Sequence, residues 1–141
     1  MKLIDYAGKL NHHDKYLEMM KILEKKCRYI EYVLIDEDDT TFVEKFERFI
    51  VLVKKKNTWW GTKSSRESKV FKLQSSREIF EYLKRMETFC KYVQSDRGDT
   101  VERTEFGIND IAFFDNEKLP LLYTTTHEGE IMVREDIIKK I

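Results

Sequence analysis

The sequence predicts an α+β fold: a mostly antiparallel sheet of about five or six strands, with two amphipathic helices packed on one face. Two segments carry apolar residues at helical spacing, and short β-branched or aromatic segments lie between and after them. The links between these short segments have hairpin length, which favours antiparallel pairing. The 141 residues are expected to form one domain spanning residues 1–141.

The first helix is expected from Asn11 to Tyr29. Its apolar stripe consists of Tyr16, Met20, Leu23 and Cys27. Asn11 is a suitable capping residue at the start, and three basic residues lie in the last turn, where the helix dipole favours cations. A short strand is expected at Tyr32–Ile35, and the acidic run Asp36–Asp39 then forms a loop.

The strongest strand signal is Phe49–Val53, within a longer segment from Phe46 to Lys56. This run is apolar at every position, so both faces of the strand are expected to be covered and the strand to lie in the centre of the sheet. A helical turn at Phe42–Phe46 precedes it. The chain then passes the pair Trp59–Trp60 and forms a further short strand around Val70–Leu73.

The second helix is expected from Ser76 to about Val93. Ser75 and Glu78 have the spacing of a capping box, which marks a helix start. The apolar face that follows consists of Ile79, Phe80, Leu83, Met86, Cys90 and Val93. Residues 95–107 are polar and contain two glycines, so they are expected to form a loop.

The last third of the sequence is typical of a strand meander. The expected strands are Ile111–Phe114, Leu119–Thr126 and Ile131–Val133, with a tight turn at Glu128–Gly129. Residues 135–141 are expected to form a terminal helical turn. The chain therefore runs from helix to strands, to helix, and to strands again.

The charge is balanced overall but not along the chain. Lys plus Arg and Asp plus Glu each number 26, yet residues 41–80 carry +6, residues 1–40 carry −2 and residues 81–141 carry −4. No apolar run reaches the ~20 residues that a membrane-spanning helix needs. The first ten residues contain Asp5 and Lys9 and do not have the pattern of a signal peptide. We therefore expect a cytoplasmic protein without membrane contact, and the Lys- and Ile-rich usage fits a bacterial genome.

Few residues in this sequence indicate chemistry. Cys27 and Cys90 lie on apolar helix faces and are expected to be free, poorly reactive thiols in a reducing compartment. Two cysteines and three histidines without a metal-ligand spacing predict no metal site. No phosphate-binding loop or nucleophile elbow is present, so no cofactor is expected.

The basic stretch from Lys54 to Lys72 is the most informative surface candidate, because its cations flank two tryptophans. Trp and Arg often anchor protein interfaces, whereas Lys with aromatic rings also suits nucleic acid. The alternative is that one Trp belongs to the core and the lysines only keep the protein in solution. The residues predicted to bind a partner are Lys55, Lys56, Trp59, Trp60 and Arg66.

An alternative site lies at the last hairpin, where hydroxyls, an imidazole and a carboxylate follow one another. Its residues are Thr124, Thr126, His127 and Glu128. His127 would act there as a general acid or base. The competing interpretation is ordinary strand and turn chemistry, since Thr is common in strands and polar residues with Gly are common in turns.

Taken together, these features predict a non-enzymatic protein that acts by binding another protein. Its composition resembles that of the small α+β immunity and antitoxin proteins of bacteria, which implies a toxin as partner. The alternative is a protein that binds or processes nucleic acid through the basic segment and His127 with Glu128. If the acidic segments Asp36–Asp39 or Asp96–Glu105 form the interface instead, a basic partner is expected.

Overall fold

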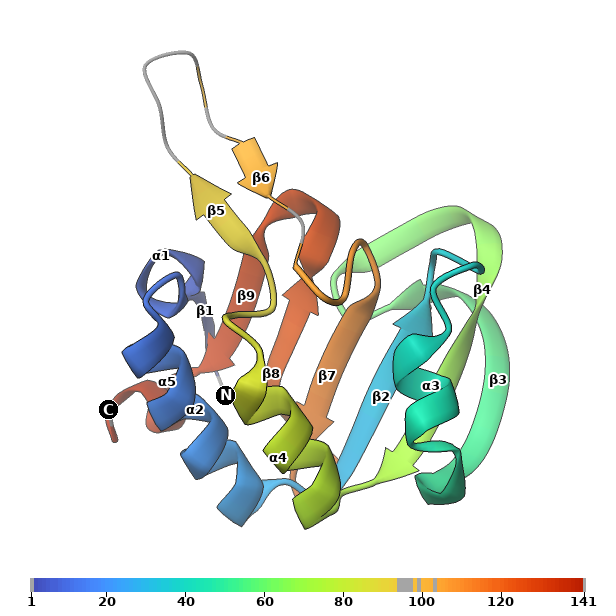
Figure 1. Ribbon diagram of the computed structural model, residues 1–141, viewed down its shortest axis with the longest axis horizontal. Coiled ribbons are helices and arrows are strands. Elements are labelled where there is room, and N and C mark those ends of the chain that lie inside the picture. The colour runs from blue at the N-terminus through green and yellow to red at the C-terminus, as the bar shows by residue number, and fades with distance from the viewer. Residues whose placement is uncertain (1, 94–97, 99, 103, 141) are drawn as a thin grey trace.

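The computed structural model describes residues 2–93, 98, 100–102 and 104–140, and it confirms the α+β class (Figure 1). The main sheet is formed by β1 (Leu3–Asp5), β2 (Tyr29–Leu34), β3 (Ile50–Trp59), β4 (Thr62–Gln74), β7 (Asp110–Phe114), β8 (Pro120–Thr125) and β9 (Glu130–Arg134). These seven strands lie in the order β1-β9-β8-β7-β2-β4-β3, and every neighbouring pair is antiparallel. The sheet is thus larger than the five or six strands predicted. A separate pair consists of β5 (Lys91–Val93) and β6 (Thr100–Glu102).

The helices lie on one side of the main sheet (Figure 1). They are α1 (Ala7–Leu10), α2 (His13–Lys26), α3 (Thr41–Lys45), α4 (Arg77–Arg85) and α5 (Glu135–Ile138), with single 3-10 turns η1 (Glu47–Phe49) and η2 (Thr126–Glu128). The two long amphipathic helices, α2 and α4, pack on one face of the sheet as predicted, and they run side by side. The Tyr16 hydroxyl on α2 donates a hydrogen bond of 2.5 Å to the Leu83 carbonyl on α4, which joins them. Among the described residues, no helix is both long enough and apolar enough to cross a membrane.

The main core fills the space between the helices and the sheet. On β2, the alternate residues Ile30, Tyr32 and Leu34 belong to this core, so they point to the helix face of the sheet. Tyr29, Glu31 and Val33 therefore point to the opposite face. On that face Val33 forms a second, small cluster with Trp59 and Val70. We call this side the tip face, because the tip of the β3–β4 hairpin folds onto it.

Both long helices end earlier than predicted. Helix α2 stops at Lys26, because Cys27 has extended backbone angles and leads directly into β2. Helix α4 stops at Arg85, and the buried side chains after it leave the helical path. Thr88 donates a hydrogen bond of 2.8 Å to the Leu10 carbonyl, and Phe89 packs edge-to-face on Tyr16. These contacts hold residues 88–90 away from a helical continuation.

The starts of the two helices also differ from the capping signals. Helix α2 begins at His13, with His12 rather than Asn11 at the N-cap position. Ser76 caps α4, because its Oγ accepts a 3.2 Å hydrogen bond from the Ile79 backbone N–H. The Ser75–Glu78 capping box is therefore not formed. Glu78 instead pairs with Arg48 of η1, which links α4 to the segment before β3.

The prediction that Phe49–Val53 is a central strand is wrong. β3 is the last strand of the sheet and pairs only with β4 among the described strands. Val51, Leu52 and Val53 are 54%, 44% and 46% exposed. Apolar residues on both faces of a strand predict burial on both faces, but β3 lies at the end of the sheet and these side chains stay exposed. The other predicted strands are present, since β2, β4, β7, β8 and β9 overlap the expected segments, although β2 ends one residue before Ile35 and β8 lacks Leu119 and Thr126.

Candidate functional site

The predicted binding residues all lie on the β3–β4 hairpin, but on different faces of it. Lys55 and Lys69 are registered partners on the two strands, and alternation with Val33 and Val70 places both on the helix side. Lys56 points to the tip face, as do Lys54 and Lys72. The sequence run of three lysines is therefore divided between two surfaces.

On the helix side, Lys55 and Lys69 line a cavity of about 390 Å³ between the hairpin and the loop after β2. Its other walls are formed by Leu34, Glu37, Thr40 and Glu67. Two carboxylates thus face two ammonium groups in this cavity. The cavity is charge-balanced, and we assign no ligand to it.

Trp59 is buried at the hairpin tip, which comprises residues 59–62. Its indole Nε1 donates a hydrogen bond of 2.9 Å to Oδ2 of Asp110. The ring packs with Val33 and Val70 in the small cluster of the tip face. Trp59 therefore positions the hairpin and offers no exposed ring to a partner.

Asp110 is the carboxylate that holds this tip in place. Oδ1 accepts a 2.8 Å hydrogen bond from the Thr126 backbone N–H, while Oδ2 accepts the Trp59 bond. Burial raises the pKa of Asp110 above its ordinary value, although these two donors act in the opposite direction. One side chain thus joins the hairpin tip, the start of β7 and the turn after β8.

Trp60 is half-buried and lies beside the aromatic residues of β7 and β8. Its ring centroid is 6.0 Å from that of Phe114 and 6.4 Å from that of Tyr123. Its Nε1 makes a long hydrogen bond of 3.4 Å to the Thr124 carbonyl. Gly61 follows with φ +73°, and a Cβ there would approach the Tyr123 ring at 3.2 Å. The turn needs glycine for both reasons.

The remaining predicted residue, Arg66, is exposed on β4. Its Nη2 donates a 3.4 Å hydrogen bond to the Ile35 carbonyl at the end of β2. Arg66 therefore lies beside the small cluster of Val33, Trp59 and Val70, away from the outer edge of β3. The structure brings Trp59 and Trp60 together, but it does not gather all five predicted residues into one surface.

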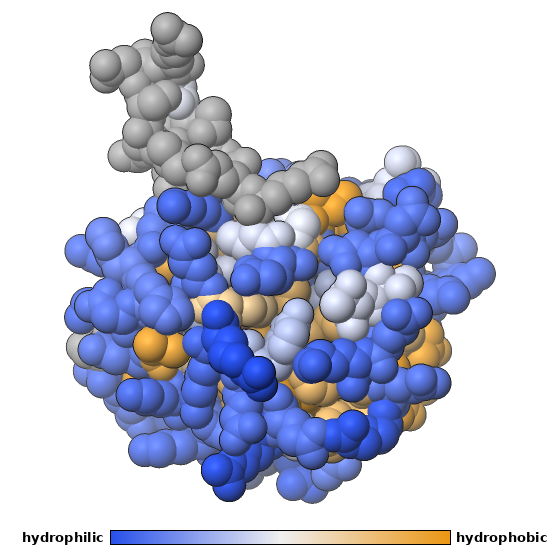
Figure 2. All heavy atoms as spheres, viewed as in Figure 1, coloured by the Kyte–Doolittle hydropathy of each residue, from blue (hydrophilic) through white to orange (hydrophobic). Residues whose placement is uncertain are grey.

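The outer edge of β3 has a feature that the sequence did not indicate. The register between β3 and β4 shifts twice, between Ile50 and Leu52 and again between Lys56 and Thr58. Between these irregularities runs a regular stretch, Leu52–Lys56, which we call the edge segment. All five of its side chains are exposed. Figure 2 shows mainly hydrophilic residues on the helix side, with hydrophobic ones at the right margin, where Figure 1 places β3.

In the alternative site, the two threonines are buried while His127 and Glu128 are exposed. Thr124 and Thr126 are buried, and their hydroxyl oxygens lie 2.9 Å apart in a hydrogen bond with each other. The Thr124 hydroxyl also accepts a 3.0 Å hydrogen bond from the Ile111 backbone N–H. His127 and Glu128 are exposed on η2, with Nε2 and Oε1 3.7 Å apart. The threonine hydroxyls are thus used within the fold and do not converge on His127.

Neither cysteine has the setting of a reactive thiol. Cys90 is buried, and burial raises its pKa to about 12. Cys27 is half-buried and its sulfur donates to the Tyr29 carbonyl at 3.2 Å, yet burial still raises its pKa to about 12. Within the described part of the chain, no group of three or more His, Cys, Asp or Glu is placed to hold a metal ion.

Two buried polar centres were missed by the sequence analysis. Asn109 accepts hydrogen bonds from the backbone N–H groups of Ile35 and Asp36, and donates to the Tyr32 hydroxyl and the Asp39 carbonyl. It thereby fixes the acidic loop Asp36–Asp39. In the sequence, the only sign of this buried role is the polar pair Asn109-Asp110 directly before an apolar strand. Of the other acidic segment, Asp96–Glu105, residues 96, 97, 99 and 103 lie outside the described residues.

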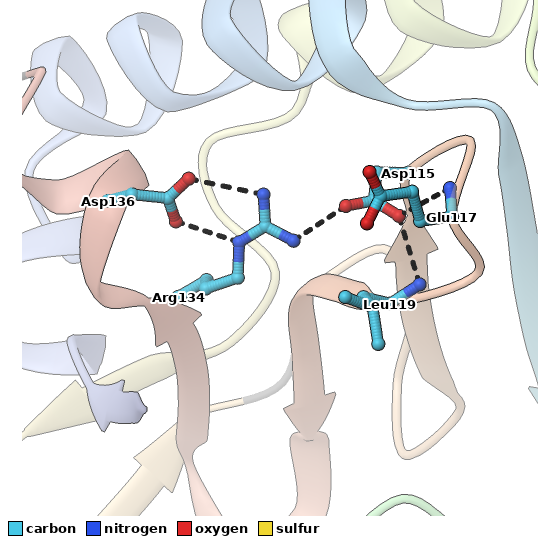
Figure 3. A network of polar contacts seen from close by, with 5 residues as sticks. All are labelled: Asp115, Glu117, Leu119, Arg134 and Asp136. Atoms are coloured by element: carbon cyan, nitrogen blue, oxygen red, sulfur yellow. Dashed lines mark hydrogen bonds and ion pairs between the residues drawn. The ribbon is translucent and has the colours of Figure 1, made fainter. Parts of the chain in front are cut away.

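The second centre is Arg134, which is only 8% exposed (Figure 3). It makes two hydrogen bonds to Asp136, of 2.7 and 3.1 Å, and one of 2.7 Å to Asp115. Asp115 also accepts from the backbone N–H groups of Glu117 and Leu119. Arg134 pairs with both carboxylates, so the network joins the β7–β8 turn to the end of β9.

Comparison of the chain with protein-family models, with curated proteins and with solved structures gives no match.

Proposed function

We propose that this protein acts by binding, without turnover, and that the edge segment Leu52–Lys56 receives an extended acidic segment of a partner protein. The observation that carries the proposal is the open edge of β3. An edge strand presents a row of backbone N–H and C=O groups, which a further strand can pair with. The two register shifts limit this regular edge to five residues.

The side chains of the edge segment define the chemistry of the partner. Leu52 and Val53 offer apolar contact, and Lys54, Lys55 and Lys56 offer three positive charges. On an added strand, acidic residues opposite the lysines would form pairs of opposite charge. Apolar residues opposite Leu52 and Val53 would form apolar contacts. Because strand side chains alternate, acidic residues are needed on both faces of that strand.

The same lysines disfavour association of the protein with itself through this edge. Antiparallel pairing of the edge segment with a second copy, centred on its middle residue, would set Lys54 opposite Lys54 of the other chain. Like charges directly opposite each other in a sheet are destabilising. Lysine and bulges on edge strands are also the usual protection against unwanted pairing. The lysines of the edge segment therefore disfavour pairing with a second copy of the chain and favour pairing with an acidic strand.

A toxin is the partner class that we propose within this scheme, as in small immunity proteins. An inhibitor that adds a strand to an acidic segment of a toxin would cover that segment by backbone pairing and charge complementarity. Two features support this finer proposal: the α+β class and the concentration of positive charge in residues 41–80.

The test is a calorimetric titration with two synthetic peptides that share an alternating Val and Thr framework. One carries Glu opposite the lysine positions, and the other carries Lys there. We expect the Glu peptide to bind and the Lys peptide to bind at least about tenfold more weakly, a difference of about 1.4 kcal/mol. Reversing Lys54, Lys55 and Lys56 to Glu should exchange the two preferences.

The matched control reverses three exposed lysines elsewhere: Lys9, Lys21 and Lys139. This variant has the same net charge as the edge variant and should keep the preference of the wild type. Thermal melts establish that both variants are folded. Equal loss of binding in the two variants would show that overall charge, rather than the edge of β3, attracts the peptide, and the proposal would then fail.

A further inference from the structure

The tip face carries a second surface, which adjoins the outer edge of β3. Three half-buried aromatic rings, from the hairpin tip, β7 and β8, lie together there: Trp60, Phe114 and Tyr123. A fourth ring, Tyr29, is registered opposite Phe114 on the neighbouring strand β2. Half-buried rings on the face of a sheet can present π-surfaces to solvent while their backbone remains fixed.

Positive charge lies beside these rings. Lys72 is registered opposite Glu31, and its Nζ lies 4.2 Å from the centroid of the Tyr29 ring. Lys54 and Lys56 also act on the Glu31 carboxylate from the same side of the hairpin. The three ammonium groups therefore share one side of the sheet with the aromatic rings.

The carboxylates on this face limit where an anion can bind. Glu31 is half-buried among the three lysines, and burial raises its pKa while the lysines lower it. Asp110 is covered by Trp59 and uses both oxygens within the fold. Glu130 and Asp5 lie towards the opposite margin, on β9 and β1. The region around Lys54, Lys56 and Lys72 is thus the basic part of the face, with three cations to one carboxylate.

We infer that the tip face binds single-stranded nucleic acid, with bases stacked on Trp60 and Tyr123 and phosphates near Lys54, Lys56 and Lys72. Stacking needs unpaired bases, and every base offers a π-face, so this surface would prefer single strands without strong dependence on sequence. Phosphates then meet ammonium groups at the basic margin. This function is independent of the proposed protein partner, although the two surfaces share Lys54 and Lys56.

The hairpin provides a matched pair of variants for the test. Lys54→Gln with Lys72→Gln removes two charges from the tip face. Lys55→Gln with Lys69→Gln removes two charges from the same strands on the helix side. The probes are an oligothymidylate, an oligouridylate and a duplex DNA, titrated while tryptophan fluorescence is recorded. Because Trp59 is buried, quenching by stacking would report mainly on Trp60.

We expect both single strands to quench the fluorescence and the duplex to bind more weakly. The Lys54/Lys72 variant should bind less tightly. The slope of its log binding constant against log salt concentration should be shallower by about 0.7 for each lost phosphate contact. The Lys55/Lys69 variant should bind as the wild type does. Tyr123→Leu should weaken binding roughly tenfold, because one base loses its stacking partner.

Other outcomes would overturn the inference. Equal losses in the two lysine variants would indicate attraction by overall charge alone. If polyglutamate competes as well as the oligonucleotides, and Tyr123→Leu binds as tightly as the wild type, the ligand of this face is an acidic protein. Absence of binding by folded wild-type protein would remove the site altogether.

Discussion

Asn109 shows at the scale of one residue how a polar side chain can shape a loop. Its carboxamide is buried, and its hydrogen-bond partners lie in β2 or in the loop after it. A buried amide is stable only when its donors and acceptors are satisfied. Asn109 therefore fixes the path of the acidic loop relative to β7, and that path sets where the cavity beside Lys55 lies.

Replacing Asn109 by Ala should lower the free energy of unfolding by about 2–4 kcal/mol, because several buried groups lose their partner at once. Urea denaturation followed by circular dichroism measures this. Asn116→Ala, at an exposed turn position, is the control and should change stability by less than about 0.5 kcal/mol. Similar midpoints for the two variants would mean that Asn109 does not hold the loop.

Asp110 predicts a pH dependence of stability. Its folded-state pKa is raised, so the folded protein holds this proton more tightly than the unfolded chain. The stability that this provides is fully present below the unfolded pKa and is lost as the pH rises through the folded pKa. The free energy of unfolding of wild type minus that of Asp110→Asn should therefore fall as the pH rises from about 4 towards neutrality.

Asp115 supplies the control for this experiment. Burial acts to raise its pKa, but the hydrogen bond from Arg134 and two backbone donors outweigh this and hold the pKa below its ordinary value. Its stabilisation is present above the unfolded pKa and is lost as the pH falls through the folded pKa. The corresponding difference for Asp115→Asn should be flat above about pH 5 and should shrink in more acidic solution. Parallel profiles for the two variants would contradict both assignments.

At the scale of elements, the β3–β4 hairpin depends on its tip. The hairpin lies at the margin of the sheet, and Trp59 attaches its far end to Asp110. Trp59→Phe keeps a ring of similar shape but removes the indole donor, which leaves a buried carboxylate oxygen without its partner. We expect a loss of about 1–3 kcal/mol and faster amide exchange at residues 57–63.

The neighbouring tryptophan is the matched comparison for this variant. The Trp60 hydrogen bond is longer, at 3.4 Å, and ends on a backbone carbonyl, so Trp60→Phe should have the smaller effect. Amide exchange in α4 should remain as in the wild type for both variants. If Trp59→Phe leaves exchange at the tip unchanged, the tip is held by ring packing and not by Asp110.

The helices and strands show which features local pattern predicts. The apolar stripes predicted α2 and α4 because helical spacing is a local property, and β-branched runs predicted β2 and β7 for the same reason. The ends of the helices were less predictable. Contacts with Leu10 and Tyr16, distant in sequence, decide where the chain leaves α4. The edge position of β3 likewise depends on which strands become its neighbours.

At the scale of the molecule, the candidate site could be predicted only in part. The basic stretch and both tryptophans were identified from composition, but their division between two faces follows from register and alternation. The role of Trp59 depends on Asp110, which lies 51 positions later in the chain. The sequence places threonine hydroxyls next to His127, whereas the fold uses those hydroxyls in internal hydrogen bonds.

Amide hydrogen exchange in the presence of the Glu peptide shows whether the edge segment of β3 accepts an acidic strand. In the free protein, amides of Leu52–Lys56 that point away from β4 should exchange fast, and those that pair with β4 should exchange slowly. Bound peptide should slow the fast set alone, which gives protection at alternate residues. Protection that is uniform across β3, or confined to other elements, would contradict strand addition at this edge.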